Sequence, residues 1–178
     1  MEKLNEKTFV DKNIDWFYLC QNYKLSEKFI KKYQNEFNWV EISHYQRLSE
    51  NFIREFKDKV SWDNICCYQS ISENFMREFK NKINWTNISR HQKLSEDFIR
   101  EYQKEVYWPN ISGNQKLSES FIKEFQDKVN WFWIFNSQKL SKNFIKKFKN
   151  KVNWEQVLKH RSIFNNFVKE YDENFCNI

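Results

Sequence analysis

A tryptophan recurs every 23 residues along this chain, and no other feature of the sequence constrains the fold as strongly. The tryptophans are Trp16, Trp39, Trp62, Trp85, Trp108, Trp131 and Trp154. The segment around them repeats as well: residues 48–70 read LSENFIREFKDKVSWDNICCYQS, and similar stretches begin at residues 25, 71, 94 and 117, with a weaker one at residue 140. An unbroken period of this length is typical of a solenoid, in which each repeat packs against its neighbours.

Each repeat contains the signals for two helices, of which the first begins near Ser49. This serine is a good N-cap because its hydroxyl can accept a backbone N–H of the first turn. Leu48 and Ile53 have the spacing of a hydrophobic staple around the cap. Ile53, Phe56 and Val60 then share one face of a helix about three turns long.

A second, shorter helix begins at Ser61, or at an asparagine in the same place in most other repeats. It carries Trp62, Ile65 and Gln69 at intervals of three and four residues, which places them on one face. The single proline, Pro109, falls in the first turn of such a helix, where a missing N–H is harmless. A lone repeat cannot bury these apolar faces, so we expect the repeats to stack.

The repeat predicts an all-α fold: an elongated helical-repeat solenoid of about seven 23-residue two-helix units with degenerate terminal caps. We expect one domain over residues 1–178. Residues 1–24 are a degenerate N-terminal repeat, residues 25–162 hold six repeats, and residues 163–178 form a C-terminal capping half-repeat.

Polar residues also recur at fixed positions. A Glu follows most of the N-cap serines, and a Lys or Arg stands four residues after it. A basic column of this kind could follow a polyanion, but a Glu and a cation four residues apart on a helix neutralise each other, so we favour a solvated, self-neutralised face. The other recurring polar residues are Gln46, Gln69, Gln92, Gln115 and Gln138. We predict that these glutamines form a ladder within the fold, because buried amides need hydrogen-bond partners.

Cysteine usage and hydropathy indicate the compartment. Cys20, Cys66, Cys67 and Cys176 form no CxxC pair, and we expect free thiols in a reducing cytosol. The first residues lack the apolar stretch of a signal peptide, and no run of 18 apolar residues occurs. We therefore predict a cytoplasmic protein without a membrane partner.

Extra aromatic residues mark two places as candidate partner-binding sites. Phe132 and Trp133 stand where other repeats mostly have polar residues, and Phe135 replaces a small residue. Phe17 and Tyr18 add aromatic rings to the first repeat. Either a C-terminal cap covers the later cluster, or it is an exposed patch for a partner. The leading hypothesis is a non-catalytic protein-binding scaffold that uses these five residues.

Two alternatives remain open, and the first is a repeat protein that binds single-stranded nucleic acid, such as RNA. Its bases would stack on aromatic side chains while cations contact the phosphates. The residues concerned are Tyr45, Arg47, Tyr68, Arg90, His91, Lys93, Lys116 and Lys139. The second alternative is a structural array that associates with itself, and the sequence does not predict an oligomeric state.

The motifs of common enzymes and metal sites are missing from the sequence. It contains no Gly-rich phosphate loop, GxSxG, HExxH or paired-cysteine motif. We therefore expect no enzyme activity, no cofactor and no metal.

The repeat resembles the LSExFIxxFxxxVxWxxISxxQ tandem-repeat proteins of giant DNA viruses and phages, from Trp16 to about Val168. These proteins share no established activity, so the resemblance implies a setting rather than a function. That setting is an infected host cell. A small, basic, non-enzymatic protein there raises the hypothesis of a counter-defence inhibitor of a host protein such as an RNA-guided nuclease, an anti-CRISPR protein.

Overall fold

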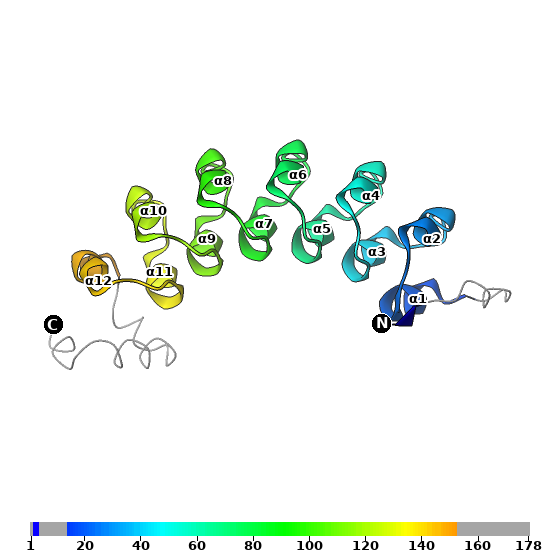
Figure 1. Ribbon diagram of the computed structural model, residues 1–178, viewed down its shortest axis with the longest axis horizontal. Coiled ribbons are helices and arrows are strands. Elements are labelled where there is room, and N and C mark those ends of the chain that lie inside the picture. Colours follow the sequence, from blue (N-terminus) through cyan, green and yellow to red (C-terminus); the bar gives the residue numbers. More distant parts are fainter. Residues whose placement is uncertain (1, 4–13, 153–178) are drawn as a thin grey trace. The chain divides into compact units, whose positions relative to one another are not determined.

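The computed structural model describes residues 2–3 and 14–152 of the 178-residue chain. These residues form a succession of short helices, two per 23-residue repeat, which confirms the predicted all-α repeat fold (Figure 1). The predicted C-terminal capping half-repeat and most of the first half of the degenerate N-terminal repeat lie outside the described residues. The helices belong to two compact units, Met1–Gln92 and Lys93–Ile178.

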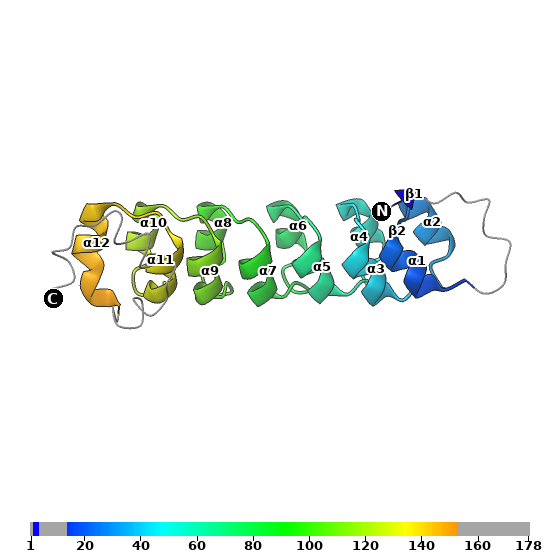
Figure 2. The same cartoon turned by 90° about the horizontal axis from the view of Figure 1, so that it is seen from below.

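Unit 1 consists of two layers of helices with a small parallel pairing at its start. Second helices of the repeats (α1, α3, α5, α7) lie in one layer and first helices (α2, α4, α6) in the other (Figure 1). Within the first of these layers α3 packs against α5, and α5 packs against α7, with their axes side by side (Figure 2). The elements are β1 (Glu2–Lys3), α1 (Trp16–Asn22), β2 (Tyr23–Lys24), α2 (Glu27–Lys32), α3 (Trp39–Tyr45), α4 (Glu50–Glu55), α5 (Trp62–Tyr68), α6 (Glu73–Glu78) and α7 (Trp85–His91).

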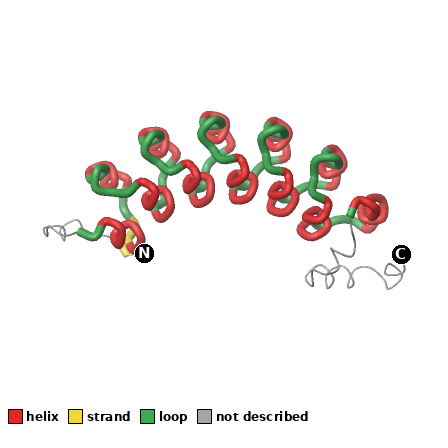
Figure 3. The backbone as a smooth tube through the Cα atoms, turned by 180° about the vertical axis from the view of Figure 1, so that it is seen from behind, coloured by secondary structure: helices red, strands yellow, loops and turns green. Residues whose placement is uncertain are grey.

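Unit 2 repeats the same arrangement. Its second helices α9 and α11 pack against each other, and short loops join them to the first helices α8, α10 and α12 (Figure 3). The elements are α8 (Glu96–Glu101), α9 (Trp108–Asn114), α10 (Glu119–Glu124), α11 (Trp131–Ser137), α12 (Lys142–Phe148) and the 3-10 turn η2 (Lys149–Lys151).

The helix ends follow the predicted capping residues. The Ser49 hydroxyl accepts the Phe52 N–H at 3.2 Å, and the equivalent serines cap the other first helices in the same way. Helix α9 is the exception among the described second helices, because its N-cap residue, Tyr107, makes no side-chain capping hydrogen bond. Pro109 is the second residue of this helix and has no N–H, so one of the donors that a cap would satisfy is absent.

The first helices are shorter than the sequence predicted. Helix α4 ends at Glu55 after six residues, and a turn continues the chain to Val60. In that turn the Phe56 carbonyl accepts two N–H groups, from Lys59 at 2.9 Å and from Val60 at 3.0 Å. The predicted apolar face survives because the turn keeps Phe56 and Val60 directed into the core, where both are buried.

Aromatic stacking joins each repeat to the next. The Trp62 ring lies 6.2 Å from the Phe75 ring and 4.9 Å from the Phe79 ring, both of the following repeat. Its indole N–H is satisfied within its own repeat, by the Lys57 carbonyl at 2.9 Å. The regular tryptophan spacing therefore reflects a contact between successive repeats, which Trp39, Trp108 and Trp131 also make.

The predicted glutamine ladder is confirmed, and each amide bridges two repeats. The Gln69 side-chain oxygen accepts the Leu48 N–H at 3.0 Å. Its NH2 group donates to the carbonyls of Ser43 at 2.9 Å and Gln46 at 2.7 Å, in the preceding repeat. Gln46, Gln92 and Gln138 make the same three bonds. In the first repeat Tyr23 stands in the glutamine position, and the backbone pairing of β1 with β2 replaces the side-chain bridge.

Small residues near the end of several second helices make another bridge. The Ser43 hydroxyl donates to the Trp39 carbonyl at 2.6 Å and accepts the Ser61 N–H of the next repeat at 2.9 Å. Cys66 takes this position in α5, and its sulfur accepts the Asn84 N–H at 3.4 Å. In α1, α3, α5, α7 and α9 the position holds a serine or a cysteine, and α11 is the exception with Phe135.

Replacing Cys66 with serine should preserve the fold and reduce the loss of stability at alkaline pH. Burial raises the pKa of the Cys66 thiol to about 11, whereas an unfolded thiol ionises near pH 8.5. The contribution of this thiol to stability is therefore complete below about pH 8.5 and decreases as the pH rises towards 11. Between pH 7 and pH 10, C66S should lose about 1–2 kcal/mol less unfolding free energy in urea than the wild type.

The half-buried Cys67 supplies the control for this measurement. C67S should track the wild type more closely than C66S does, because its thiol is less desolvated and Arg90 favours the thiolate. Equal alkaline losses in the wild type and C66S would contradict the assignment to Cys66.

Candidate partner-binding surface

Most side chains that recur in every repeat are used within the fold. The core residues, the glutamines and the small residues contact neighbouring repeats, as described above. The Glu column is used too: the Glu50 carboxylate accepts the Ser72 N–H of the next repeat at 2.6 Å. The residues that differ between repeats lie mainly one, two, five and six positions after each tryptophan, on the side of the second helices away from the first helices. We call the exposed residues at these positions the second-helix face.

The outer surface of the first helices is a network of ion pairs. Arg54 lies 3.6 Å from Glu50, four residues before it, and 2.8 Å from Glu78 of the next repeat. The predicted self-neutralised stripe is therefore confirmed, but the closer partner comes from the neighbouring repeat. Its guanidinium also lies 5.0 Å from the centre of the Phe75 ring. This arrangement leaves the surface of α4 and α6 charged and free of exposed large apolar side chains.

Exposed large hydrophobic residues gather instead on the second helices. Within residues 14–152, all six belong to a second helix or, for Tyr107, to the residue directly before one. The exposed fractions are 53% for Phe17, 56% for Tyr18, 51% for Val40, 56% for Tyr68, 48% for Tyr107 and 40% for Trp133. Apolar exposure of this kind, concentrated on the second helices of each unit, marks the second-helix face as the candidate binding surface.

In unit 1 the second-helix face carries a row of rings in mutual contact. The Phe17 ring meets the Tyr45 ring edge-on at 6.5 Å. The His44 ring lies 4.3 Å from the Tyr45 ring and 4.0 Å from the Tyr68 ring. We call Phe17, Tyr45, His44 and Tyr68 the aromatic row; it crosses α1, α3 and α5. Sequence reasoning missed His44 as the ring that joins the two tyrosines, because the contact depends on how far successive helices are offset.

In unit 2 the face is formed by the predicted aromatic cluster, with one correction. Trp133 is exposed, its ring lies edge-on to Phe132 at 5.1 Å, and it covers Gly113 of the preceding repeat. Phe135, however, is buried and lies 5.9 Å from the Trp131 ring. The prediction that Phe135 takes part in partner binding was wrong, since this position faces the next repeat and the larger side chain fills the core there.

The residues of the nucleic-acid alternative fall on both units. Unit 1 holds Tyr45, Arg47, Tyr68, Arg90 and His91, and among these the structure brings the two tyrosines together through His44. All of these except the half-buried Tyr45 are exposed. Unit 2 holds three further exposed cations, Lys93, Lys116 and Lys139.

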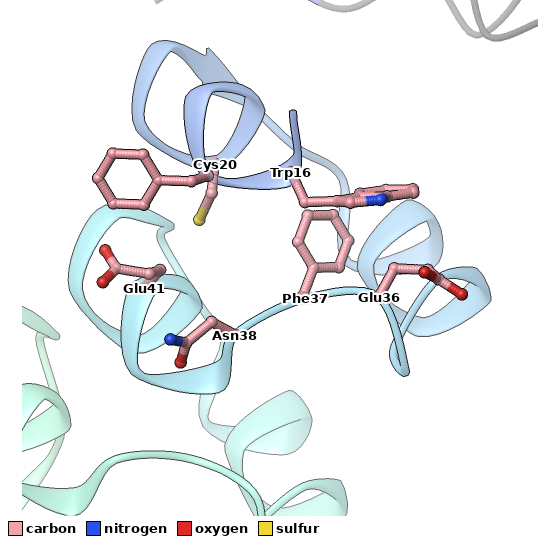
Figure 4. A pocket seen from close by; sticks show the side chains of 7 residues that line it. Trp16, Cys20, Glu36, Phe37, Asn38 and Glu41 are labelled. Carbon is pink, nitrogen blue, oxygen red and sulfur yellow. The ribbon is translucent and has the colours of Figure 1, made fainter. Parts of the chain in front are cut away.

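A pocket of about 160 Å³ opens between α1 and α3 (Figure 4). The Cys20 sulfur points into it, and burial together with Glu41 raises the pKa of this thiol to about 12. A thiol so firmly protonated is a poor nucleophile and a poor metal ligand. The other lining residues are Trp16, Phe17, Glu36, Phe37 and Asn38.

Residues 2–3 and 14–152 contain no group of three or more His, Cys, Asp or Glu side chains that could hold a metal ion. Nor does any helix in these ranges have the length and apolar character needed to cross a bilayer.

The chain matches no known family model, and no curated protein or solved structure is similar to it. The resemblance to viral tandem-repeat proteins therefore stays a prediction.

Proposed function

We propose that this protein is a non-catalytic scaffold that binds another protein through its second-helix face. The observation that carries the proposal is the location of the exposed hydrophobic residues, since all six in the described ranges lie on or next to second helices. Aromatic side chains at the centre of an interface commonly supply most of the binding energy.

The aromatic row favours binding because its rings are already held in place. Each ring in the row contacts at least one other, as with His44 between Tyr45 and Tyr68. Side chains that are ordered before binding lose less conformational entropy when a partner arrives. Tyrosines also offer an apolar ring together with a hydroxyl that can hydrogen-bond, which suits protein surfaces.

Differences between repeats supply specificity for one partner. Five residues after the tryptophan, for example, the residue differs in every described repeat while the core positions stay alike: Gln21, His44, Cys67, Arg90, Gly113 and Asn136. A face with a distinct pattern at each repeat can be complementary to one partner surface and not to others. The viral resemblance favours a host protein as that partner. In an infected host cell, the proposal is that the protein binds and inhibits a host protein such as an RNA-guided nuclease.

The test is affinity capture from a lysate of the host cells, with nuclease added, using the full chain and two paired variants. One variant joins Phe17→Ala with Tyr68→Ala in unit 1, and the other joins Phe132→Ala with Trp133→Ala in unit 2. The matched control joins Lys57→Ala with Lys80→Ala, two exposed residues of the first-helix layer. A captured protein should be reduced at least about tenfold by one or both aromatic pairs and unchanged by the lysine pair.

Other outcomes would contradict the proposal. Capture that both aromatic pairs leave unchanged, with circular dichroism showing intact helices, would exclude the second-helix face. Recovery of nucleic acid in samples without nuclease, lost as salt rises, would favour the single-stranded nucleic-acid alternative. Recovery of the chain itself alone would favour a self-associating array.

A further inference from the structure

The ion pairs between first helices follow one rule along the described chain. Each pair joins a cation at the seventh position of one repeat to a Glu at the eighth position of the next. In the repeats that begin at residues 48 and 71, for example, these residues are Arg54 and Glu78. The distances are 2.5 Å for Lys31 to Glu55, 2.8 Å for Arg54 to Glu78 and 2.9 Å for Arg100 to Glu124. Stacking thus brings these two positions into direct contact.

Helix α12 breaks this rule. Lys147 stands at the position that Glu55, Glu78 and Glu124 occupy in earlier repeats. By the same register, the cation of α10 at the pairing position, Lys123, has a lysine opposite it instead of a glutamate. Residues 142–151 hold five lysines and no acidic residue, whereas the same ten positions of the preceding repeat, residues 119–128, hold three acidic residues and two lysines. The charge change is confined to this end of the described chain.

Three lysines of this region have no neutralising carboxylate among residues 14–152. Lys123, Lys146 and Lys147 are all exposed, and within residues 14–152 none of them forms an ion pair. The Lys147 ammonium lies 5.6 Å from the centre of the Phe148 ring, which does not neutralise it. We call these three residues the lysine patch. Like charges at a contact position repel each other, and an anion bound between them would remove that repulsion.

The surroundings of the lysine patch favour one kind of anion. None of the exposed large hydrophobic residues of the described chain lies on α10 or α12, so this surface offers nothing to insert into a lipid bilayer. The aromatic residues of α12, Phe144 and Phe148, are buried and cannot stack on bases. Lysines act as point charges for phosphates without selecting a geometry.

We propose that the lysine patch binds the phosphate backbone of a nucleic-acid duplex without reading its sequence. The patch lies in the first-helix layer of unit 2, in the layer opposite α9 and α11 (Figure 1). The lysine patch is therefore separate from the second-helix face. Whether the patch binds a duplex does not depend on whether the second-helix face binds a protein.

The test is fluorescence anisotropy of a labelled short RNA or DNA duplex with the full chain at 50 and 200 mM salt. The wild type should bind at low salt and weaken as salt rises, because bound phosphates release counterions. Lys147→Glu, which restores the carboxylate found in earlier repeats, should weaken binding at least about tenfold at 50 mM salt and lower the salt slope by about one or more. Lys123→Glu should act in the same direction.

The control is Lys80→Glu, an exposed lysine of the first-helix layer in unit 1 with the same change in net charge. It should change the affinity less than about twofold, because Lys80 is not one of the lysines that would contact the phosphates. Equal weakening by Lys80→Glu would show that net charge alone attracts the duplex and would overturn the site. Absence of duplex binding by the wild type at 50 mM salt would also overturn the site. So would binding of the wild type to anionic lipid vesicles but not to the duplex. The free energy of unfolding of Lys147→Glu should be no lower than that of the wild type. This comparison distinguishes a loss of duplex binding from a loss of the fold.

Discussion

Phe75→Ala should lower the free energy of unfolding by about 3–5 kcal/mol, the range expected for truncating a fully buried aromatic side chain. The Phe75 side chain is completely buried, with its ring against Trp62 of the preceding repeat and 4.7 Å from the Phe79 ring. Removing it leaves a cavity at the joint between two repeats, where the rigid indole cannot collapse inward. Urea unfolding followed by tryptophan fluorescence and by helix circular dichroism would measure the loss.

Phe17→Ala is the control for this variant because the same ring type is removed from an exposed position. Phe17 is 53% exposed, so its loss should cost less than about 1 kcal/mol. A cost for Phe75→Ala that is as small as the cost for Phe17→Ala would show that stacking between repeats is not what holds unit 1 together. A larger loss by fluorescence than by circular dichroism would show that the repeats separate before the helices melt.

Gln69→Leu should destabilise the protein by about 3 kcal/mol although leucine is the more hydrophobic residue. The substitution leaves three buried backbone groups without their partner: the Leu48 N–H and the carbonyls of Ser43 and Gln46. A buried polar group left unsatisfied costs about 1–3 kcal/mol, and some of the three will gain water in the variant. The same urea titration measures the change.

Two further glutamines calibrate this result. Gln138 makes the same bonds but is only half-buried, so Gln138→Leu should cost less than Gln69→Leu. Gln21 is exposed and lies outside the ladder, and Gln21→Leu should change stability by no more than about 0.5 kcal/mol. Equal effects at the three positions would mean that the amide bonds contribute nothing beyond side-chain volume.

Local signals in the sequence predicted the helices well. The hydroxyl of each N-cap serine acts over three residues, as from Ser49 to Phe52, and needs no other part of the chain. The burial of Ile53 and Ile65 follows from helical spacing for the same reason. The length of the first helices was overestimated, because the spacing of Phe56 and Val60 fits both a helix and the turn that the chain adopts.

The candidate site was predicted only in part. Trp133, Phe17 and Tyr18 are exposed, and the sequence singled them out because they differ from the residues at the same positions in most other repeats. Phe135 was misplaced, since one residue in the sequence cannot show whether a position faces solvent or the next repeat. The lysine patch was missed because the position that pairs with Lys123 could be identified only from the ion pairs between earlier repeats, such as Arg54 with Glu78.

The sequence by itself determined that this protein is an all-α repeat, where each helix begins, and which residues form the core, because capping and periodicity act within a few residues. Only the tertiary structure decided which side chains meet across repeats. The offset between stacked helices brings His44 between Tyr45 and Tyr68 and pairs Arg54 more closely with Glu78 than with Glu50. That offset results from packing between neighbouring repeats, and a single repeat has no neighbour against which to define it.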